Sequence, residues 1–205
     1  YLFDDTKFRT RSAVRMADDW AYYAETMGVE YITCLGSPFT MPRTRVVEFC
    51  RELVRRRLGI KWICYARADD LCDADLVARL REAGCVQVQV GIESGDQGQL
   101  DRMNKRTTVR ENAAALATCR RAGLTTVISL IVGFPGETRE TLQRTCDMLA
   151  ESPPDFHFLA TFSTRVATVP VLRPENAERF GLVTDANPHT VSPYWRHHTM
   201  SCAEV

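Results

Sequence analysis

The chain has 205 residues, of which 45% are hydrophobic and 25% are charged, which is ordinary for a soluble globular protein of one large or two small domains. Its 26 basic and 26 acidic side chains cancel, so no net field favours nucleic acid or an anionic membrane as a partner. No run approaches the roughly 20 apolar residues of a membrane span. We therefore expect neither nucleic acid nor a membrane among its partners.

Eight cysteines are spread along the chain without a regular spacing. None forms a Cys-x-x-Cys pair, and most fall within apolar or helical patterns. We interpret them as reduced core thiols of a cytoplasmic protein. A zinc site built from Cys64 and Cys72 is the alternative.

The predicted helices begin at a capping or first-turn residue. Thr108 with Glu111 three residues later forms a capping box, and Ser12, Pro42 and Asp73 are suitable starts for three earlier helices. With glycines as the usual stops, the pattern predicts helices over about residues 12–27, 42–58, 73–83, 108–122 and 138–151.

The predicted strands lie between these helices. Each is a short run rich in β-branched or aromatic residues, apolar throughout or alternating. They cover about residues 29–34, 60–67, 85–92, 124–133 and 155–163. Strands separated by helices, with no antiparallel interlude, predict a parallel sheet covered by helices. A doubly wound sheet and a (β/α) barrel both fit this order.

Helical patterning fades after Phe180. The tail from Asp185 carries prolines, Trp195, His197 and His198, and its pattern predicts no element. We favour solvated coil or packing against another domain over a contact with substrate.

Polar groups and glycines follow the predicted strands. In both architectures ligands bind beyond the carboxyl ends of the strands, and glycine lets a backbone approach a ligand closely. The segments at these ends are Cys34-Leu-Gly-Ser-Pro, Tyr65-Ala-Arg-Ala-Asp69, Gly91-Ile-Glu-Ser-Gly95, Val132-Gly-Phe-Pro-Gly-Glu137 and Ser163-Thr-Arg165. They offer a carboxylate, hydroxyls and guanidinium groups, which suit a ligand with sugar hydroxyls, an amino group and a carboxylate.

Plainer interpretations exist for single positions. Glu93 also suits the N-terminus of a helix, and Gly133-Phe-Pro-Gly also suits a type II turn. No P-loop, Gly-x-Gly-x-x-Gly or His-Glu-x-x-His pattern occurs, and His157 lies on a predicted strand, which excludes the corresponding phosphate and zinc sites. The convergence of all five strand ends favours a ligand site.

Three segments, in this order, resemble the radical S-adenosylmethionine (SAM) superfamily. They are Val90–Val109, Leu130–Leu142 and Pro154–Pro170. Phe8–Ser12 (FRTRS) is also similar to the Arg-x-Arg-Ser stretch that opens the first helix in that family. The resemblance covers about residues 8–170 and is closest to the branch whose members often carry an upstream cobalamin-binding domain.

The resemblance implies a partial (β/α) barrel, of which the predicted strands are numbers two to six of six. It divides the chain into a core barrel over residues 1–170, without its first strand and cluster loop, and a C-terminal extension over residues 171–205. Family members hold a four-iron, four-sulfur cluster on a Cys-x-x-x-Cys-x-x-Cys loop. No such motif occurs here, so we expect its cysteines upstream of Tyr1 and expect the chain alone to be inactive.

The resemblance also implies the chemistry. An electron from the cluster cleaves SAM, and the resulting 5′-deoxyadenosyl radical abstracts hydrogen from an unactivated carbon. The branch favours a cobalamin-dependent methyltransferase with a small-molecule or peptide substrate and an electron donor such as flavodoxin or ferredoxin. The alternative is a cluster-less (β/α) nucleotide-binding or regulatory domain.

Site residues follow from the same resemblance. It assigns Glu93 and Ser94 to the ribose hydroxyls or the amino group of SAM. Arg67 is the candidate partner of the methionine carboxylate. Gly36 and Ser37 occupy the strand end that contacts the methionine amino group in relatives.

The remaining candidates lie farther along the chain. The backbone of Gly133, Phe134 and Pro135 would pack against the adenine, and Arg165 would reach either SAM or the substrate.

Overall fold

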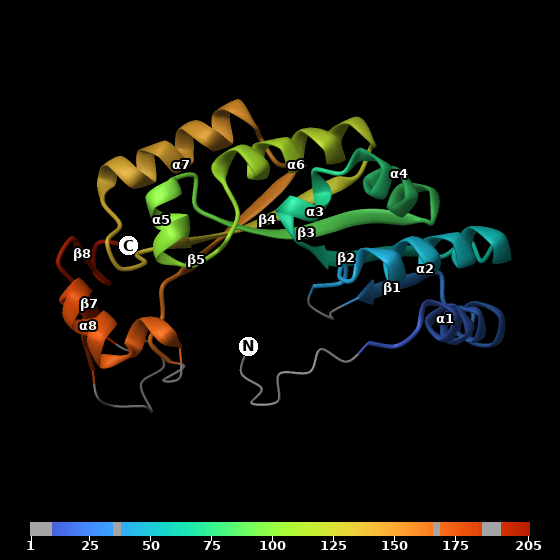
Figure 1. The fold of residues 1–205 in the computed structure, drawn as a ribbon, viewed down its shortest axis with the longest axis horizontal. Coiled ribbons are helices and arrows are strands. Elements are labelled where there is room, and N and C mark those ends of the chain that lie inside the picture. Colours follow the sequence, from blue (N-terminus) through green and yellow to red (C-terminus); the bar gives the residue numbers. More distant parts are fainter. Residues whose placement is uncertain (1–9, 35–37, 166–168, 186–193) are drawn as a thin grey trace.

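A parallel sheet forms the centre of the molecule. The computed structural model describes residues 10–34, 38–165, 169–185 and 194–205. Within them, five parallel strands follow one another in sequential order, and all of them point the same way in Figure 1. The strands are β1 (Tyr31–Cys34), β2 (Lys61–Ala66), β3 (Cys85–Glu93), β4 (Thr125–Val132) and β5 (Phe156–Thr161).

Helices connect the strands. Those before and between the strands are α1 (Ala13–Met27), α2 (Arg43–Arg56), α3 (Ala68–Leu71), α4 (Ala74–Glu82), α5 (Gln97–Arg102), α6 (Val109–Arg121) and α7 (Arg139–Glu151). In Figure 1, α4, α6 and α7 lie above the sheet.

The crossover helices cover one face of the sheet and leave the other face without them. In β2 the alternate residues Trp62, Cys64 and Ala66 are buried, whereas Tyr65 is 37% exposed. A doubly wound sheet would reverse its strand order and carry helices on both faces. Sequential order with helices on one face is the geometry of a partial (β/α) barrel, so this prediction of the fold is confirmed.

Capping residues place several helix ends as predicted. The Ser12 hydroxyl accepts a hydrogen bond from the N–H of Arg15 at 3.3 Å, and α1 ends at Gly28 with φ +67°. Thr108 and Glu111 satisfy each other's backbone N–H groups in a capping box. These bonds satisfy donors that the first turn of a helix otherwise leaves without partners.

Two local predictions were wrong. Helix α2 was expected to continue to residue 58, but it ends at Arg56 because Arg57 adopts a left-handed conformation with φ +55°. The short helices α3 and α5 were not predicted. Helix α5 follows Gly95-Asp96, a pattern typical of a turn, and begins because the Asp96 carboxylate accepts the N–H of Gln99 at 2.8 Å.

The tail is folded where the structure describes it. It forms a 3₁₀ turn, a short helix and an antiparallel three-stranded sheet: η1 (Pro170–Leu172), α8 (Pro174–Phe180), β6 (Val183–Thr184), β7 (Trp195–His197) and β8 (Met200–Ser201). Trp195 is 2% exposed and packs with Phe162 and Leu182 in a second apolar core. Solvated coil was therefore the wrong expectation for this residue.

The second core closes one end of the molecule. Ile131 of β4 packs against it, and α8, β7 and β8 lie at the left of Figure 1, where β4 and β5 end. None of the helices in the described part of the chain combines the length and apolar character that a bilayer-spanning helix needs.

Trp62 is the central side chain of the main core, and its removal tests the packing. It is fully buried, its indole N–H donates to the Ala83 carbonyl at 2.8 Å, and its ring packs against Trp20 and Phe39. Trp62→Phe should lower the free energy of unfolding by about 1.5–3 kcal/mol, because it leaves a cavity and a buried carbonyl without its donor. Urea unfolding measures this.

Tyr22→Phe is the matched control, since Tyr22 is 56% exposed. It should change the free energy of unfolding by less than about 0.5 kcal/mol. Equal effects of the two substitutions would contradict the central role of Trp62.

Candidate functional site

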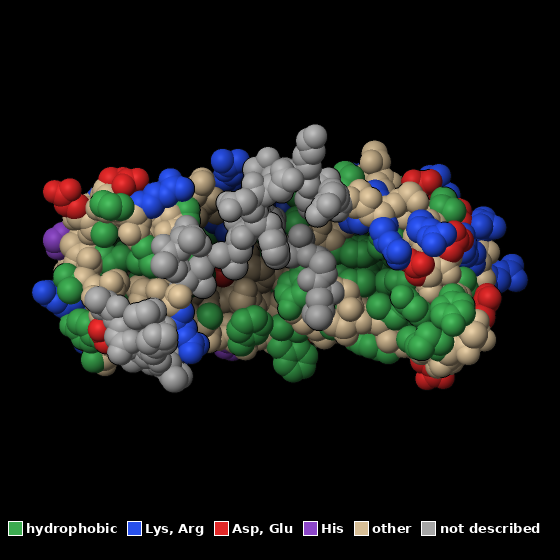
Figure 2. All heavy atoms as spheres, turned by 90° about the horizontal axis from the view of Figure 1, so that it is seen from below, with side chains coloured by type: hydrophobic (Ala, Val, Ile, Leu, Met, Phe, Trp, Pro, Cys, Tyr) green, Lys and Arg blue, Asp and Glu red, His purple; other side chains and the backbone are tan. Residues whose placement is uncertain are grey.

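A cleft of about 280 Å³ opens at the carboxyl ends of β2, β3 and β4. It lies on the face that the crossover helices leave uncovered, and this side is hollowed near its middle in Figure 2. The cleft is lined by Pro38, Tyr65, Ala66, Arg67, Ala68, Gln89, Gly91, Glu93, Lys105, Thr107 and Ser129. Two of the predicted site residues, Arg67 and Glu93, are therefore brought together.

Glu93 carries the negative charge of the cleft. It ends β3 in the left-handed conformation, with φ +65°, which costs a residue with a Cβ about 1–2 kcal/mol. Its Oε1 accepts a hydrogen bond from Lys105 Nζ at 2.6 Å, and both side chains are partly exposed. An unfavourable backbone conformation thus places an ion pair at the cleft wall.

The ion pair occupies the space in which a side chain at Gly91 would lie. A Cβ built on Gly91 would overlap Glu93 Oε1 and would lie 2.8 Å from Lys105 Nζ. Any side chain at residue 91 would therefore displace the pair. Gly91, two residues before the end of β3, is explained by close approach of these groups rather than by a turn.

Ser94 lies away from the cleft, and its hydroxyl is used within the protein. It is 1% exposed, its Oγ lies 3.3 Å from Thr145 Oγ1, and it accepts the N–H of Asp96 at 3.1 Å. Asp96 in turn accepts from Arg144 Nε at 2.6 Å. Residues 94–96 are therefore attached to α7, and Ser94 is placed as an anchor rather than as a ligand contact.

Arg67 borders the cleft in a fixed orientation. Its Nε and Nη2 donate to the two carboxylate oxygens of Asp69 at 2.9 and 2.8 Å. Its backbone N–H donates to the Thr40 hydroxyl, which donates to Asp70 at 2.6 Å. Burial raises the pKa of Asp70 above its ordinary value, against the opposing effect of the Thr40 bond. The guanidinium is oriented by this network before any ligand binds.

Thr107 contributes a buried hydroxyl to the part of the cleft that the structure describes. Its residue is 5% exposed, and its Oγ1 has no hydrogen-bond partner among the residues that the structure describes. A buried hydroxyl normally has such a partner. Thr107 lines the cleft, but its Oγ1 is itself buried.

Gly133, Phe134 and Pro135 follow β4 but do not line the cleft. Gly133 and Pro135 are buried, and Phe134 packs against the second apolar core, with its ring 5.5 Å from that of Phe162. The structure therefore groups these three residues with the C-terminal elements. They lie one strand away from Glu93, because β3 pairs with β4.

Of the remaining predicted residues, the structure describes only Arg165 and does not describe Gly36 and Ser37. Phe8 and Arg9 of the stretch FRTRS also lie outside the described residues. Arg165 is exposed beyond the end of β5, its backbone N–H donates to Ser163 Oγ at 3.3 Å, and it does not line the cleft.

Several cleft residues were missed from the sequence. Gln89 and Ser129 sit on strands, and the alternation of Gln87, Gln89 and Gly91 with valines could have assigned them to one face. Lys105 and Thr107 follow α5, an unpredicted helix. They fall within the quoted segment Val90–Val109, but no role was assigned to them.

The described cysteines do not form a metal site. Among the residues that the structure describes, no group of three or more His, Cys, Asp or Glu side chains could hold a metal ion. A hydrogen bond with Cys85, together with burial, raises the pKa of Cys64, and burial raises the pKa of Cys34 to about 12. Without such a metal-binding group, the zinc alternative at Cys64 and Cys72 has no support among the described residues.

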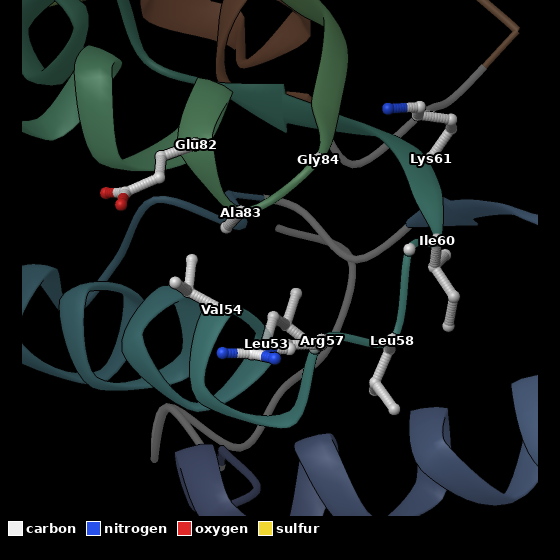
Figure 3. A pocket seen from close by; sticks show the side chains of 10 residues that line it. Leu53, Val54, Arg57, Leu58, Ile60, Lys61, Glu82, Ala83 and Gly84 are labelled. Atoms are coloured by element: carbon white, nitrogen blue, oxygen red, sulfur yellow. The ribbon is translucent and has the colours of Figure 1, made fainter.

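A second cavity, of about 210 Å³, lies at the opposite edge of the sheet. Figure 3 shows Leu53, Val54 and Arg57 on one side of it and Ala83 and Gly84 on the other. Two helices, α2 and α4, end beside it, and its lining mixes Arg57 and Lys61 with Glu82. Arg57 and Lys61 would attract an anion to this cavity. The C-terminal ends of the two helices carry partial negative charge and would repel it. The cleft at the carboxyl ends is therefore the candidate site.

Comparison with known proteins identifies one family. The model of the radical SAM superfamily matches residues 4–149. The anaerobic magnesium-protoporphyrin IX monomethyl ester cyclase of Rubrivivax gelatinosus is 32% identical over 149 residues, which are 72% of this chain and 27% of that protein. An uncharacterised methyltransferase of Pyrococcus horikoshii is 27% identical over 139 residues, 68% of this chain and 30% of that protein. The chain thus spans less than a third of these curated relatives.

Solved structures share the fold. The radical SAM methyltransferase TsrM from Kitasatospora setae, with cobalamin and a 4Fe-4S cluster bound, superposes with a TM-score of 0.68 at 21% identity, over 74% of this chain and 29% of that one. Coproporphyrinogen III oxidase from Escherichia coli superposes with a TM-score of 0.59 at 19% identity, over 84% and 42% of the two chains.

The left-handed conformation of Glu93 yields a prediction that needs no ligand. Glu93→Ala and Glu93→Gly both remove the carboxylate, but only glycine accepts φ +65° without a steric cost. The glycine variant should therefore be the more stable of the two by about 1 kcal/mol in urea unfolding. An alanine variant that is equally stable or more stable would show that this conformation is not held in solution.

Proposed function

The chain belongs to the radical SAM superfamily, and from that premise we propose that the cleft around Glu93 binds S-adenosylmethionine. The match over residues 4–149 confirms the family that three quoted segments predicted. The observation that carries the proposal is the Glu93–Lys105 ion pair, at 2.6 Å, inside a cleft at the carboxyl ends of the strands.

The charges of the cleft complement the methionine end of SAM. That end carries an ammonium and a carboxylate, and the cleft presents Glu93 against Lys105 and Arg67. When SAM binds, its ammonium can pair with Glu93 and its carboxylate with Lys105, in place of the Glu93–Lys105 pair. Each charge then keeps a partner of opposite sign. A bidentate Arg67 contact would add orientation.

The neutral lining complements the sugar. Gln89 and Ser129 offer an amide and a hydroxyl at the same wall. Thr107 adds a buried hydroxyl that has no partner among the described residues. At about 280 Å³ the cleft falls just below the roughly 300–1,000 Å³ of small-molecule sites. It therefore encloses a part of SAM, and we assign the purine to the neighbouring strand end at Phe134, the half-buried residue between the buried Gly133 and Pro135.

The residues of this chain do not fit an iron–sulfur cluster. No Cys-x-x-x-Cys-x-x-Cys motif occurs in the sequence, and the described residues bring together no cluster-binding group. The share of the chain in the reaction is therefore to bind and orient SAM and to limit access of water. Bound SAM supplies the chemistry, either a carbon radical on reductive cleavage or a methyl group.

For the reaction class we propose cobalamin-dependent methyl transfer, with an electron donor such as flavodoxin or ferredoxin. The structural neighbour TsrM, which binds cobalamin, is a methyltransferase, and one sequence relative is named as a methyltransferase. Cyclisation without methyl transfer is the second candidate, because a cyclase is the relative that is 32% identical over 149 residues.

Glu93→Gln tests the binding proposal. The amide keeps the shape and removes the charge, so the affinity for SAM should fall by about 1.5–3 kcal/mol, or roughly 10- to 150-fold. Isothermal titration of the protein expressed from its intact gene measures this. Glu82→Gln, at the opposite edge of the sheet, is the matched control and should leave the affinity unchanged. If the wild type, Glu93→Gln and Glu82→Gln bind SAM with equal affinity, Glu93 is not part of the binding site.

The products distinguish the two reaction classes. Methyl transfer from SAM leaves S-adenosylhomocysteine, whereas reductive cleavage alone leaves methionine and 5′-deoxyadenosine. With reconstituted protein from the intact gene under anaerobic conditions, we expect S-adenosylhomocysteine to accumulate in a cobalamin-dependent manner. Formation of 5′-deoxyadenosine without S-adenosylhomocysteine would favour the cyclase class.

A further inference from the structure

The peptide groups of Gly133 are held from two directions. Its N–H donates to the carboxylate of Glu137, which is 1% exposed, and its carbonyl lies 3.2 Å from His197 Nε2. Glu137 belongs to the same loop, since its own N–H donates to the Phe134 carbonyl at 2.9 Å. His197 comes from β7, far later in the chain.

Trp195 occupies the place of a side chain at Gly133. A Cβ built on Gly133 would lie 2.5 Å from Trp195 Cη2 and 2.9 Å from Val205 Cγ2. Gly133 also has φ +84°, a region that favours glycine. The glycine that was expected to admit a ligand therefore admits the indole of the chain's own C-terminal hairpin, which comprises β7 and β8 (Trp195–Ser201).

The hairpin holds these two rings in a fixed arrangement. Trp195 stacks on His197 with their ring centroids 5.5 Å apart and their planes 4° apart, and it meets Phe162 edge-on at 5.3 Å. Trp195 and His197 are both buried. The indole therefore fixes the plane of the imidazole that meets the Gly133 carbonyl.

Hydrogen bonding assigns the tautomer of His197. The N–H of Thr199 donates to Nδ1 at 3.4 Å, so that this nitrogen is the acceptor. The proton is therefore on Nε2, which donates to the Gly133 carbonyl. Burial lowers the pKa of His197 below its ordinary value, which favours this neutral form, although the bond to Gly133 opposes the shift.

We propose that Trp195 and His197 are positioning residues, which hold the loop 133–137 in the conformation that receives the purine of SAM. The inference rests on the proposed function and adds a role for the C-terminal hairpin in it. A glycine followed by a turn has many accessible conformations. The bond from His197 and the packing of Trp195 select one of them before the ligand arrives, which lowers the entropic cost of binding.

Variants of His197 separate positioning from packing. In His197→Gln the side-chain amide can still donate to the Gly133 carbonyl, whereas His197→Leu fills the space without a donor. S-adenosylhomocysteine is the probe, titrated by calorimetry into the protein expressed from its intact gene. We expect His197→Leu to weaken its affinity about tenfold, the loss of one well-placed hydrogen bond. His197→Gln should recover affinity to within about threefold of the wild type.

His157→Leu is the matched control, because His157 is an exposed histidine of β5 that does not line the cleft. It should leave the affinity unchanged. If His197→Leu does not fold, Trp195→Phe serves as the second variant, since it keeps a ring in the core and removes the indole atoms that contact Gly133. Thermal unfolding of each variant shows which are folded.

The outcomes separate the two proposals. A wild-type protein that does not bind S-adenosylhomocysteine overturns the proposed function. A wild type that binds it, with folded His197→Leu and Trp195→Phe variants of equal affinity, overturns only the role of the hairpin. Reduced affinity in both His197→Leu and His197→Gln also counts against the role of the hairpin. The hydrogen bond to Gly133 would then not be the cause of the loss.

Discussion

The attachment of residues 94–96 to α7 is the constraint on which the candidate site depends. The Ser94 hydroxyl contacts Thr145, and the Asp96 carboxylate pairs with Arg144. These contacts fix the chain just after β3, so that Glu93 must turn through a left-handed conformation to leave the strand. The cost of that conformation is met by burial and hydrogen bonding next to it, and the result is a carboxylate that faces the cleft.

Two groups of residues at the same edge of the sheet have different characters. Around Glu93 the lining is polar and charged, and the Thr107 hydroxyl has no partner among the described residues. Around Gly133 the polar groups of the peptide are already paired, and the surroundings are aromatic. A polar amino-acid end of a ligand suits the first group, and a flat purine suits the border of the second. This division matches the two halves of SAM.

The charge of the cleft is balanced before any ligand arrives. Lys105 neutralises Glu93, and Asp69 neutralises Arg67. An isolated cation or anion in the cleft would therefore have to disrupt one of these pairs without replacing it. A zwitterion that disrupts one of these ion pairs supplies a new partner for each of its two charges. The arrangement therefore selects for ligands that carry both charges. This specificity follows from the pairing of the groups and not from the net charge of the chain, which is zero.

The sequence by itself determined the elements whose signals are local. Capping at Ser12, Asp73 and Thr108 and apolar periodicity located the five strands and most helices between them, because such signals act within a turn or two of the chain. The short helices α3 and α5 and the left-handed end of α2 were missed. For α5 the local signal was present, because Asp96 caps its first turn, but Gly95-Asp96 is also a pattern typical of a turn.

Only the tertiary structure decided what depends on contacts between distant residues. It selected a barrel over a doubly wound sheet, because sheet order is set by the packing of all crossover helices together. It turned Glu93 toward the cleft and Ser94 toward α7, although the two are neighbours in sequence. It brought Lys105 to Glu93 and Trp195 to Gly133. Pairings of this kind arise from the path of the whole chain, which no local pattern encodes.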